Sequence, residues 1–354
     1  MRNDILIVGA LPPPITGQSI ITSKVVQVLD NKANFINTVK YGSRSPKSFL
    51  YVFKKLPIYL LSCDRIYITP SRTLGGSFRD VLVIITALIC RKSLVAHLHG
   101  VDFNALLKEH GVWSKTLCFF YNKVSCFVLL YPAMYTQIAA LKEPNFTVIP
   151  NCFDSSLKSD IITSKGLFDK ERKTISYLSN IMSSKGIFEF LDLSEELLER
   201  NQNLFISIAG AFLGDDEMTK YEVEKSFLDI FRKLSDRYGD RIEYLGIVRG
   251  LKKEELLLKT DILCFPTRYK MEAQPLVLIE ALYYGCSIIF SDHNDLKNQF
   301  CFSNNLCFKD ITADDVLRQF NRKEKVQQRK TNHSFALTNF SVEKFSSNII
   351  NLLS

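Results

Sequence analysis

The 354-residue sequence has no apolar stretch long enough to cross a membrane as a helix. Its longest such run, from Val81 to Cys90, contains one threonine and is bounded by a charged residue on each side. A membrane-spanning helix needs about 20 apolar residues. Residues 1–9 enter a predicted strand directly. We therefore expect neither a membrane span nor a signal peptide.

Cysteine patterns typical of metal sites or of secreted proteins are also missing. The nine cysteines are an odd number and form neither a C-x-x-C pair nor a zinc-binding spacing. This favours reduced thiols and a cytoplasmic location. No D-x-D follows an apolar strand, and the acidic pair Asp215-Asp216 is predicted at a helix start, where it complements the helix dipole. We predict no metal and no bound cofactor.

Acidic residues are scarce in the first half of the chain. Residues 1–150 hold 17 Lys and Arg against 7 Asp and Glu, whereas residues 151–354 hold 28 against 30. The positive excess therefore lies in the first half, which predicts an anionic partner for that half. No recognition helix, zinc finger or basic-aromatic platform is visible, so we expect no nucleic acid. An anionic membrane surface or a pyrophosphate-linked lipid fits the charge.

The chain does contain a regular alternation of short apolar runs and helical patterns. Strands are predicted at 4–9, 34–39, 65–69, 93–100, 126–131, 146–150, 174–179, 204–210, 241–246, 261–266 and 286–292. Helices are predicted at 18–30, 47–62, 76–91, 113–123, 132–142, 185–200, 217–237, 252–259 and 275–284. Such alternation indicates parallel sheets connected by crossover helices.

This alternation predicts two domains. Residues 151–172 are polar and form the expected linker between an N-terminal domain, 1–160, and a C-terminal domain, 173–335. A helix at about 342–354 is expected to pack back on the first domain. The predicted fold class is α/β, with two Rossmann-like, doubly wound parallel-sheet domains facing a central cleft. Ligands of such sheets bind at the carboxyl ends of the strands.

Glu272 and Glu280 lie eight residues apart across a strand–loop–helix junction. Pro275 suits the first turn of a helix, and the apolar residues that follow extend the helix to Tyr284. The amides of such a first turn are able to bind a phosphate. Carboxylates on both sides of a phosphate accept hydrogen bonds from hydroxyls. A ligand with hydroxyls at both ends and phosphates between them is a nucleotide sugar. Two incidental surface glutamates beside a buried strand are the plain alternative.

Other polar or flexible residues follow predicted strands. Gly17 precedes a helix and permits close backbone approach, although its loop is not a G-x-G-x-x-G fingerprint. His97 and His99 share one face of a strand, and His99 lies at its tip. Lys185 stands near a helix start, where a cation opposes the helix dipole unless an anion lies between them. The structural alternatives are an ordinary turn at Gly17, a core histidine at His97 and a surface lysine at Lys185.

The helix expected at 47–62 carries an apolar stripe beside lysines. The stripe consists of Phe49, Phe53, Leu56 and Leu60, and the lysines are Lys47, Lys54 and Lys55. A core-facing helix is one interpretation. A helix that lies on anionic lipid is the other.

The segment 264–286 resembles the E-x7-E motif of retaining glycosyltransferases of family 4, which have the GT-B fold. The resemblance implies that Glu272 contacts the donor sugar and that Glu280 holds the ribose. The backbone expected on the diphosphate is that of Gln274, Pro275 and Leu276. It further implies transfer with retention of anomeric configuration and without a metal.

The resemblance extends to other strand ends. Lys185 matches a lysine that binds the donor diphosphate, while Asn180 stands where the family has an arginine, with Arg249 or Arg268 as candidates to compensate. His99 matches the histidine that lies near the reacting sugar and the acceptor.

Besides Asn180, two residues of this sequence differ from the family pattern. Thr16 and Cys152 replace glycines in loops of this family. Gly17 is assigned to the donor loop, and Asp102 and Asn151 are assigned to the acceptor side.

The predicted function is retaining transfer of a sugar from a UDP- or GDP-sugar to a saccharide acceptor, expected to be lipid-linked. The expected setting is bacterial surface polysaccharide assembly (O-antigen or capsule), with the enzyme peripheral on the cytosolic face of the inner membrane. The catalytic residues are His99, Lys185 and Glu272. The donor-binding residues are Gly17, Asn180, Lys185, Arg249, Glu272, Gln274, Pro275, Leu276 and Glu280, and the acceptor-binding residues are His99, Asp102 and Asn151. A catalytically silent GT-B partner protein and a nucleotide-sugar epimerase are the alternatives.

Overall fold

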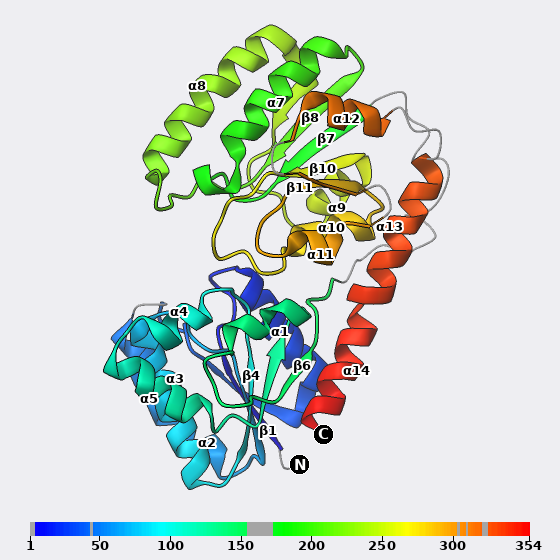
Figure 1. Cartoon of the computed structure of the whole chain (residues 1–354). Coiled ribbons are helices and arrows are strands. Elements are labelled where there is room, and N and C mark those ends of the chain that lie inside the picture. Colours follow the sequence, from blue (N-terminus) through cyan, green and yellow to red (C-terminus); the bar gives the residue numbers. More distant parts are fainter. Residues whose placement is uncertain (1–3, 43–44, 154–172, 303–304, 309–310, 321–324) are drawn as a thin grey trace. The chain divides into compact units, whose positions relative to one another are not determined.

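The computed structural model describes residues 4–42, 45–153, 173–302, 305–308, 311–320 and 325–354 (Figure 1). The chain divides into two compact units. The first contains Met1–Cys152, Met271–Gln274 and Val342–Ser354, and the second contains Phe153–Lys270 and Pro275–Ser341. Most of the predicted linker, together with the last residues of the predicted N-terminal domain, falls on 154–172, outside the described residues.

The first unit is built on a six-stranded parallel sheet with the order β2-β1-β3-β4-β5-β6. Its strands are β1 (Ile5–Gly9), β2 (Ala33–Asn37), β3 (Arg65–Ile68), β4 (Ser93–His97), β5 (Cys126–Leu129) and β6 (Phe146–Val148). Its α-helices are α1 (Gly17–Leu29), α2 (Pro46–Leu60), α3 (Leu74–Ile89), α4 (Phe103–Lys108), α5 (Val112–Tyr121) and α14 (Val342–Leu353) (Figure 1). The strand order reverses between β1 and β3.

The second unit has its own six-stranded parallel sheet, with the order β12-β11-β10-β7-β8-β9. The strands are β7 (Lys173–Leu178), β8 (Leu204–Ala209), β9 (Ile242–Tyr244), β10 (Ile262–Phe265), β11 (Ser287–Ser291) and β12 (Leu306–Phe308). The α-helices are α7 (Ile187–Arg200), α8 (Lys220–Tyr238), α9 (Leu251–Lys259), α10 (Leu276–Tyr283), α11 (Leu296–Phe300), α12 (Ala313–Phe320) and α13 (Lys325–Phe340). The order reverses between β7 and β10.

Short 3₁₀ turns complete the two units. They are η1 (Asp30–Lys32) and η2 (Pro132–Gln137) in the first unit, and η4 (Ser183–Lys185) and η5 (Gly239–Arg241) in the second.

Both sheets are parallel and are connected by crossover helices, so the predicted fold class of two Rossmann-like, doubly wound sheets is confirmed. The central strands are buried along their whole length, as in β1 and β10. Continuous apolar strands of this kind are typical of parallel sheets that are covered on both faces. Ligands of such sheets bind where the strand order reverses, at the carboxyl ends of the strands.

The helix predicted at 132–142 is wrong, because the structure has only the 3₁₀ turn Pro132–Gln137 there. Side chains in this region bond to the backbone. The Oε1 of Gln137 accepts from the amide of Asn104 at 3.2 Å, and the Oδ1 of Asn122 accepts from the amide of Lys142 at 2.7 Å. These side-chain bonds take the place of a regular helical ladder.

Helix α2 buries a stripe that differs from the predicted one. Its buried residues are Ser48, Val52, Leu56 and Leu60, whereas Phe49 is 39% exposed. The buried residues lie four apart, as one face of a helix requires. No helix in the described ranges is long and apolar enough to cross a bilayer.

Candidate functional site

Helix α10 begins directly after Pro275 and follows β10 at the point where the strand order reverses. Pro275 is extended, with φ −64° and ψ 119°, and no side chain caps this helix start. The fixed φ of proline suits the entry into a helix. Leu276 is the first residue of α10, and both Gln274 and Pro275 are buried. The helix start is thus presented at the ligand-binding edge of the second sheet.

Glu280 lies inside α10 and is buried, with 7% of its surface exposed. Its Oε1 accepts a hydrogen bond from the Nζ of Lys253 in α9 at 2.6 Å. Burial raises the pKa of the Glu280 carboxyl, and the ammonium group of Lys253 opposes this rise. Lys253 also lies 5.7 Å from the ring centre of Phe153. The sequence analysis did not identify Lys253.

The loop that carries Glu272 groups with the first unit, whereas Glu280 groups with the second. Glu272 is half-buried. The loop is bound to Asn151, whose amide donates to Gln274 Oε1 at 2.6 Å and whose Nδ2 donates to the Gln274 carbonyl at 3.0 Å. Both side chains are buried. Asn151, predicted to contact an acceptor, therefore holds the backbone beside Glu272.

Lys185 ends the turn η4, which follows β7 on the other side of the reversal point. Its Nζ lies 4.6 Å from the ring centre of Tyr269 and 5.5 Å from that of Phe265. The next residue, Gly186, has φ +75°, and an added Cβ would lie 2.0 Å from the carbonyl oxygen of Pro266. Only glycine fits there, because the backbone conformation and the close contact both exclude a side chain.

The predicted role of Asp215 is wrong, since α8 begins at Lys220 and its cap is Thr219. Asp215 instead accepts from the amide of Ser184 at 2.7 Å and from the amides of Glu217 and Met218. Partial burial acts against the charged form, but these hydrogen bonds hold the pKa of Asp215 below its ordinary value. Asp215 thus fixes the turn that carries Lys185.

Asn180, at the position of the family arginine, is exposed. Of the two candidates to compensate, Arg268 forms ion pairs with Glu189 and Glu217. Arg249 is exposed, and no ion pair or hydrogen bond of its side chain is found within the described ranges. The positive charge of Arg268 is thus balanced by carboxylates, whereas no carboxylate among the described residues pairs with Arg249.

His99 follows β4 in the first unit and is half-buried. Burial, with the nearby charge of Arg72 as the second cause, lowers its pKa to about 3, so the ring is neutral at neutral pH. The Nε of Arg72 lies 3.7 Å from an oxygen of Asp102. An added Cβ on Gly100 would lie 2.7 Å from the other oxygen of Asp102 and 2.8 Å from Arg72. Because glycine has no side chain, Arg72 and Asp102 can both lie this close to Gly100.

Gly17 is the first residue of α1, and Thr16 is its N-cap. The hydroxyl of Thr16 accepts from the amide of Ser19 at 3.1 Å, while the hydroxyl of Ser19 accepts from the amide of Thr16 at 2.9 Å. This reciprocal capping box satisfies the amides of both Thr16 and Ser19, and the bond to the Ser19 amide is one that a glycine at position 16 could not make. Nothing lies within 4 Å of a Cβ added to Gly17.

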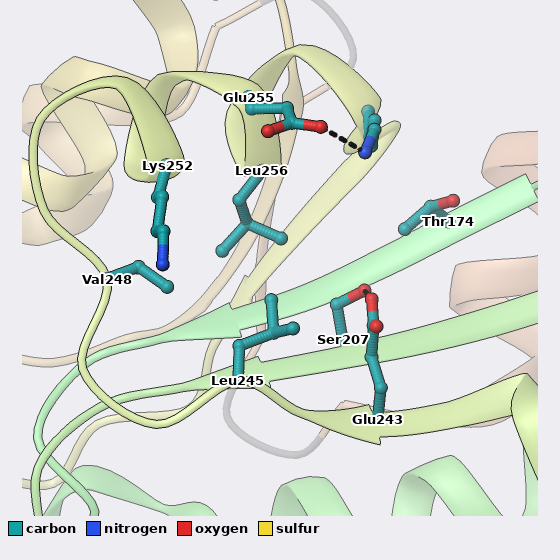
Figure 2. Close-up of a pocket in the computed structure, with 9 residues that line it drawn as sticks. Thr174, Ser207, Glu243, Leu245, Val248, Lys252, Glu255 and Leu256 are labelled. Carbon is teal, nitrogen blue, oxygen red and sulfur yellow. Dashed lines mark hydrogen bonds and ion pairs between the residues drawn. The ribbon is translucent and has the colours of Figure 1, made fainter.

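A cavity of about 520 Å³ lies between α9 and the strands β7, β8 and β9 (Figure 2). Its lining residues are Thr174, Ser207, Glu243, Leu245, Val248, Lys252, Glu255, Leu256 and Lys259. Ser207 donates to Glu243 at 2.7 Å, and Lys259 pairs with Glu255 at 2.6 Å. These groups bond with one another, and none of the predicted site residues lines the cavity. Within the described residues, no group of three metal-ligating side chains is found either.

Comparison with known proteins adds a family and a fold. A family model described as Glycosyl transferases group 1 matches residues 158–335. Among solved structures, Anabaena HepE in complex with UDP is 16% identical, with 99% of each chain covered and a TM-score of 0.70. Sucrose-phosphate synthase from Thermosynechococcus elongatus is 13% identical, with 99% of this chain and 98% of that chain covered and a TM-score of 0.65.

A third similar structure is the UDP-forming α,α-trehalose-phosphate synthase from Burkholderia xenovorans, in complex with glucose-6-phosphate. It is 10% identical, with 99% of each chain covered and a TM-score of 0.67. No curated protein matches the sequence. At these identities the solved structures establish the fold alone, which is of the GT-B type.

Proposed function

We propose, from the premise that this chain belongs to the group 1 glycosyl transferases (family 4), that it transfers a sugar from a UDP-sugar with retention of configuration. HepE is solved with UDP and with UDP-glucose, and the trehalose-phosphate synthase is named UDP-forming. These relatives favour UDP over GDP as the nucleotide. The acceptor we propose is a lipid-linked saccharide in bacterial surface polysaccharide assembly.

The buried carboxylate of Glu280, inside a helix without a side-chain cap, is the observation that carries the donor assignment. Glu280 lies four residues beyond Leu276, so about 6 Å along the helix axis at 1.5 Å per residue. Phosphates bind at a helix start, and the ribose of a nucleotide lies next to them. A ribose diol donates hydrogen bonds to a carboxylate, which compensates the cost of burying that charge.

Lys185 supplies the positive charge for the diphosphate in this proposal. Its ammonium group is held near the ring of Tyr269, and its turn is fixed by Asp215. As the bond between sugar and phosphate breaks, negative charge grows on the departing diphosphate. A prearranged cation together with a helix start stabilises that charge more than it stabilises the ground state. Arg249 and Asn180 are the further donor contacts that we propose.

The residues that we propose to bind the acceptor belong to the first unit. His99 is neutral, because burial lowers its pKa to about 3. It therefore binds a sugar hydroxyl by a hydrogen bond and not as a cation. Asp102 orients an acceptor hydroxyl, and Asn151 holds the loop of Glu272 through Gln274. Glu272 in turn contacts the donor sugar.

The lipid-linked acceptor and the peripheral location are supported by charge and by helix α2. Residues 1–150 carry the positive excess of the chain. On α2 and just beyond it, apolar side chains are exposed beside lysines. The apolar residues are Phe49 (39%), Leu50 (55%), Ile58 (59%) and Leu61 (79%), and the lysines are Lys47, Lys54 and Lys55. Apolar and basic side chains together favour binding to an anionic bilayer, which we place at the cytosolic face of the inner membrane.

Nucleotide binding tests the donor assignment. We expect UDP to raise the melting temperature more than GDP or dTDP, because a ligand that binds only the folded state stabilises it. Replacing Glu280 by Gln removes the charge at nearly constant volume and weakens the effect of UDP. Glu243→Gln changes an exposed glutamate of β9 and serves as control. If none of the three nucleotides stabilises the protein, the donor assignment is wrong.

The product of donor breakdown separates enzyme classes. A transferase without acceptor slowly hydrolyses UDP-glucose to UDP and glucose, since water replaces the acceptor hydroxyl. Release of an epimer of the sugar indicates an epimerase. Binding of UDP-glucose without any breakdown, even after long incubation, indicates a silent partner protein.

A further inference from the structure

Tyr67 and His97 form a buried hydrogen-bonded pair in the first unit. Tyr67 lies in β3 and His97 ends the neighbouring strand β4, and both are 0% exposed. The phenol oxygen of Tyr67 lies 2.5 Å from Nδ1 of His97. Their rings meet edge to face at 5.9 Å between centres. None of the roles assigned to the candidate site uses either residue.

The hydrogen-bonding groups of the pair select one tautomer of His97. Within the described part of the chain, Nε2 of His97 has no hydrogen-bond partner. If the Tyr67 hydroxyl donates to Nδ1, only the Nε2–H of His97 lacks a partner. If Nδ1–H donates instead, both the phenol hydrogen and Nε2 lack one. Because unmet buried polar groups destabilise a fold, the first arrangement is favoured, and His97 carries its hydrogen on Nε2.

The ring of His97 packs in turn against that of His99. Their centres are 4.1 Å apart and their planes are tilted by 34°. We propose that His97 is a positioning residue for His99: the Tyr67 hydroxyl fixes the orientation of the His97 ring, which fixes that of the His99 ring. The role of His99 itself rests on the proposed function.

Burial supports this arrangement by keeping both rings uncharged. It lowers the pKa of His97, with His99 as the second cause, and lowers that of His99 to about 3. Burial also raises the pKa of Tyr67, which therefore keeps the hydrogen that it donates. Two neutral rings pack against each other without the charge repulsion that two imidazolium ions experience.

Nitrogen NMR of the histidines tests the proposal without any ligand. The chain has only five histidines, so ¹⁵N-histidine spectra of the full chain are simple, and His97→Asn and a His99→Asn reference identify the signals. We expect wild-type His97 in the Nε2–H form. In Tyr67→Phe, the His97 signals should become those of a mixture of tautomers. The His99 signals should also move.

Two further variants make the test decisive. Tyr121→Phe removes a hydroxyl of another fully buried tyrosine, which bonds to Asp80 at 3.1 Å, and should leave the His97 and His99 signals unchanged. His97→Asn removes the ring and should also move the His99 signals. Unchanged His99 signals in both Tyr67→Phe and His97→Asn would overturn the proposal.

Donor hydrolysis supplies the functional readout. We expect Tyr67→Phe and His97→Asn to lower kcat for UDP-glucose hydrolysis about ten-fold, because a misplaced catalytic group costs rate. The Kd of UDP should stay within about two-fold, since the nucleotide contacts that we propose lie elsewhere. Wild-type kcat in both variants would also overturn the proposal. Failure of the wild-type chain to bind UDP overturns the donor assignment, while the NMR experiment still decides the relation between His97 and His99.

Discussion

The Nζ of Lys253 donates a 2.6 Å hydrogen bond to the carboxylate of Glu280, a residue that is 7% exposed. The pair joins α9 to α10, the helix that begins at Pro275. Removing one member of a buried ion pair leaves the other charge uncompensated, which is strongly destabilising. The proposed ribose ligand therefore depends on a lysine that makes no part of the E-x7-E motif.

Lys253→Met should destabilise the protein in a pH-dependent way. Burial raises the folded-state pKa of Glu280 above that of the unfolded chain, so stability falls as pH rises between these two values. Losing Lys253 raises the folded-state pKa further and widens this interval. We expect a loss of about 2 kcal/mol near pH 8, because the pair is partly solvated, and a smaller loss near pH 5.

Urea unfolding at the two pH values measures the effect of Lys253→Met. Lys252→Met is the matched control, because Lys252 is exposed and precedes Lys253 in the same helix. We expect a change within about 0.5 kcal/mol for this control. An equal loss for Lys253→Met at both pH values would show that the charge of Glu280 does not depend on Lys253.

Gly186→Ala should be far more destabilising than Gly239→Ala, a change at another glycine of the second unit with a positive φ. Gly186 has φ +75°, and its added Cβ would lie 2.0 Å from the carbonyl oxygen of Pro266. Gly239 has a similar φ of +62°, but nothing lies within 4 Å of its added Cβ. Gly186 has ψ 29°, whereas Gly239 has ψ −131°. The control Gly239→Ala thus measures the strain of a positive φ without a steric contact, about 1–3 kcal/mol.

We expect Gly186→Ala to lower the melting temperature by at least about 4 °C more than Gly239→Ala does. The larger drop reflects a contact with backbone that cannot move aside without displacing β10. Gly186→Ala should also weaken UDP binding, since Lys185 precedes it. Equal melting temperatures for the two variants would contradict the described approach of Gly186 to Pro266.

The fold could be predicted because central strands such as β1 and β10 are continuous apolar runs of the length that a covered parallel strand needs. In the second unit, Ile262–Phe265 of β10 is apolar throughout and Ser287–Ser291 of β11 has an apolar centre, and helix α10 separates them. The failure at 132–142 has a local cause. Helical periodicity does not show that Gln137 and Asn122 bond to the backbone of distant residues.

The E-x7-E segment could be predicted because its signals are local. Pro275 and the apolar run after it place the helix start, and Glu280 then falls within that helix. Lys253 could not be found in this way, because it is 27 residues from Glu280 and only the packing of α9 on α10 joins them. Tyr67 and His97 likewise meet only once β3 and β4 are known to be neighbours.

The sequence itself contains a signal that places Asp215 correctly, before the helix and not at its start. Thr219 and Glu222 form a capping box, in which Thr219 accepts from the Glu222 amide and the Glu222 side chain accepts from the Thr219 amide. Thr-x-x-Glu before a helical pattern predicts a helix start at the next residue. Asp215 therefore lies in the loop before α8, where it binds the turn of Lys185.

Asn180→Arg should tighten the binding of UDP. Asn180 is exposed, and the family has an arginine at this position on the donor diphosphate. Arg268 is paired with Glu189 and Glu217, so it contributes little net charge. We expect an added guanidinium to lower the Kd of UDP about ten-fold, within the range of a charge-assisted hydrogen bond.

Uridine provides the control for Asn180→Arg, because it lacks the diphosphate. Calorimetry should show an unchanged Kd for uridine and a tighter Kd for UDP. Lys185→Met should do the opposite for UDP and leave uridine unchanged. If Asn180→Arg tightens uridine and UDP alike, the new side chain contacts the nucleoside, and the assignment of position 180 to the diphosphate fails.

Helix α2 predicts salt-dependent binding to anionic membranes. Lys54 and Lys55 lie beside the exposed apolar side chains of α2. Each lysine near an anionic surface contributes about 1 kcal/mol, and salt screens this attraction. We expect the chain to sediment with phosphatidylglycerol vesicles at low salt, more weakly at about 0.5 M salt, and not with phosphatidylcholine vesicles.

Replacing both Lys54 and Lys55 by Gln should weaken this binding about ten-fold or more, since two charges leave the contact surface. Lys225→Gln combined with Lys233→Gln is the matched control, because it removes the same charge from exposed positions on α8 of the second unit. If both double variants lose binding equally, net charge and not α2 governs membrane attachment. Binding that does not change with salt would instead make exposed apolar residues such as Leu50 and Ile58 the main contacts, and the electrostatic account of the basic first half would then be wrong.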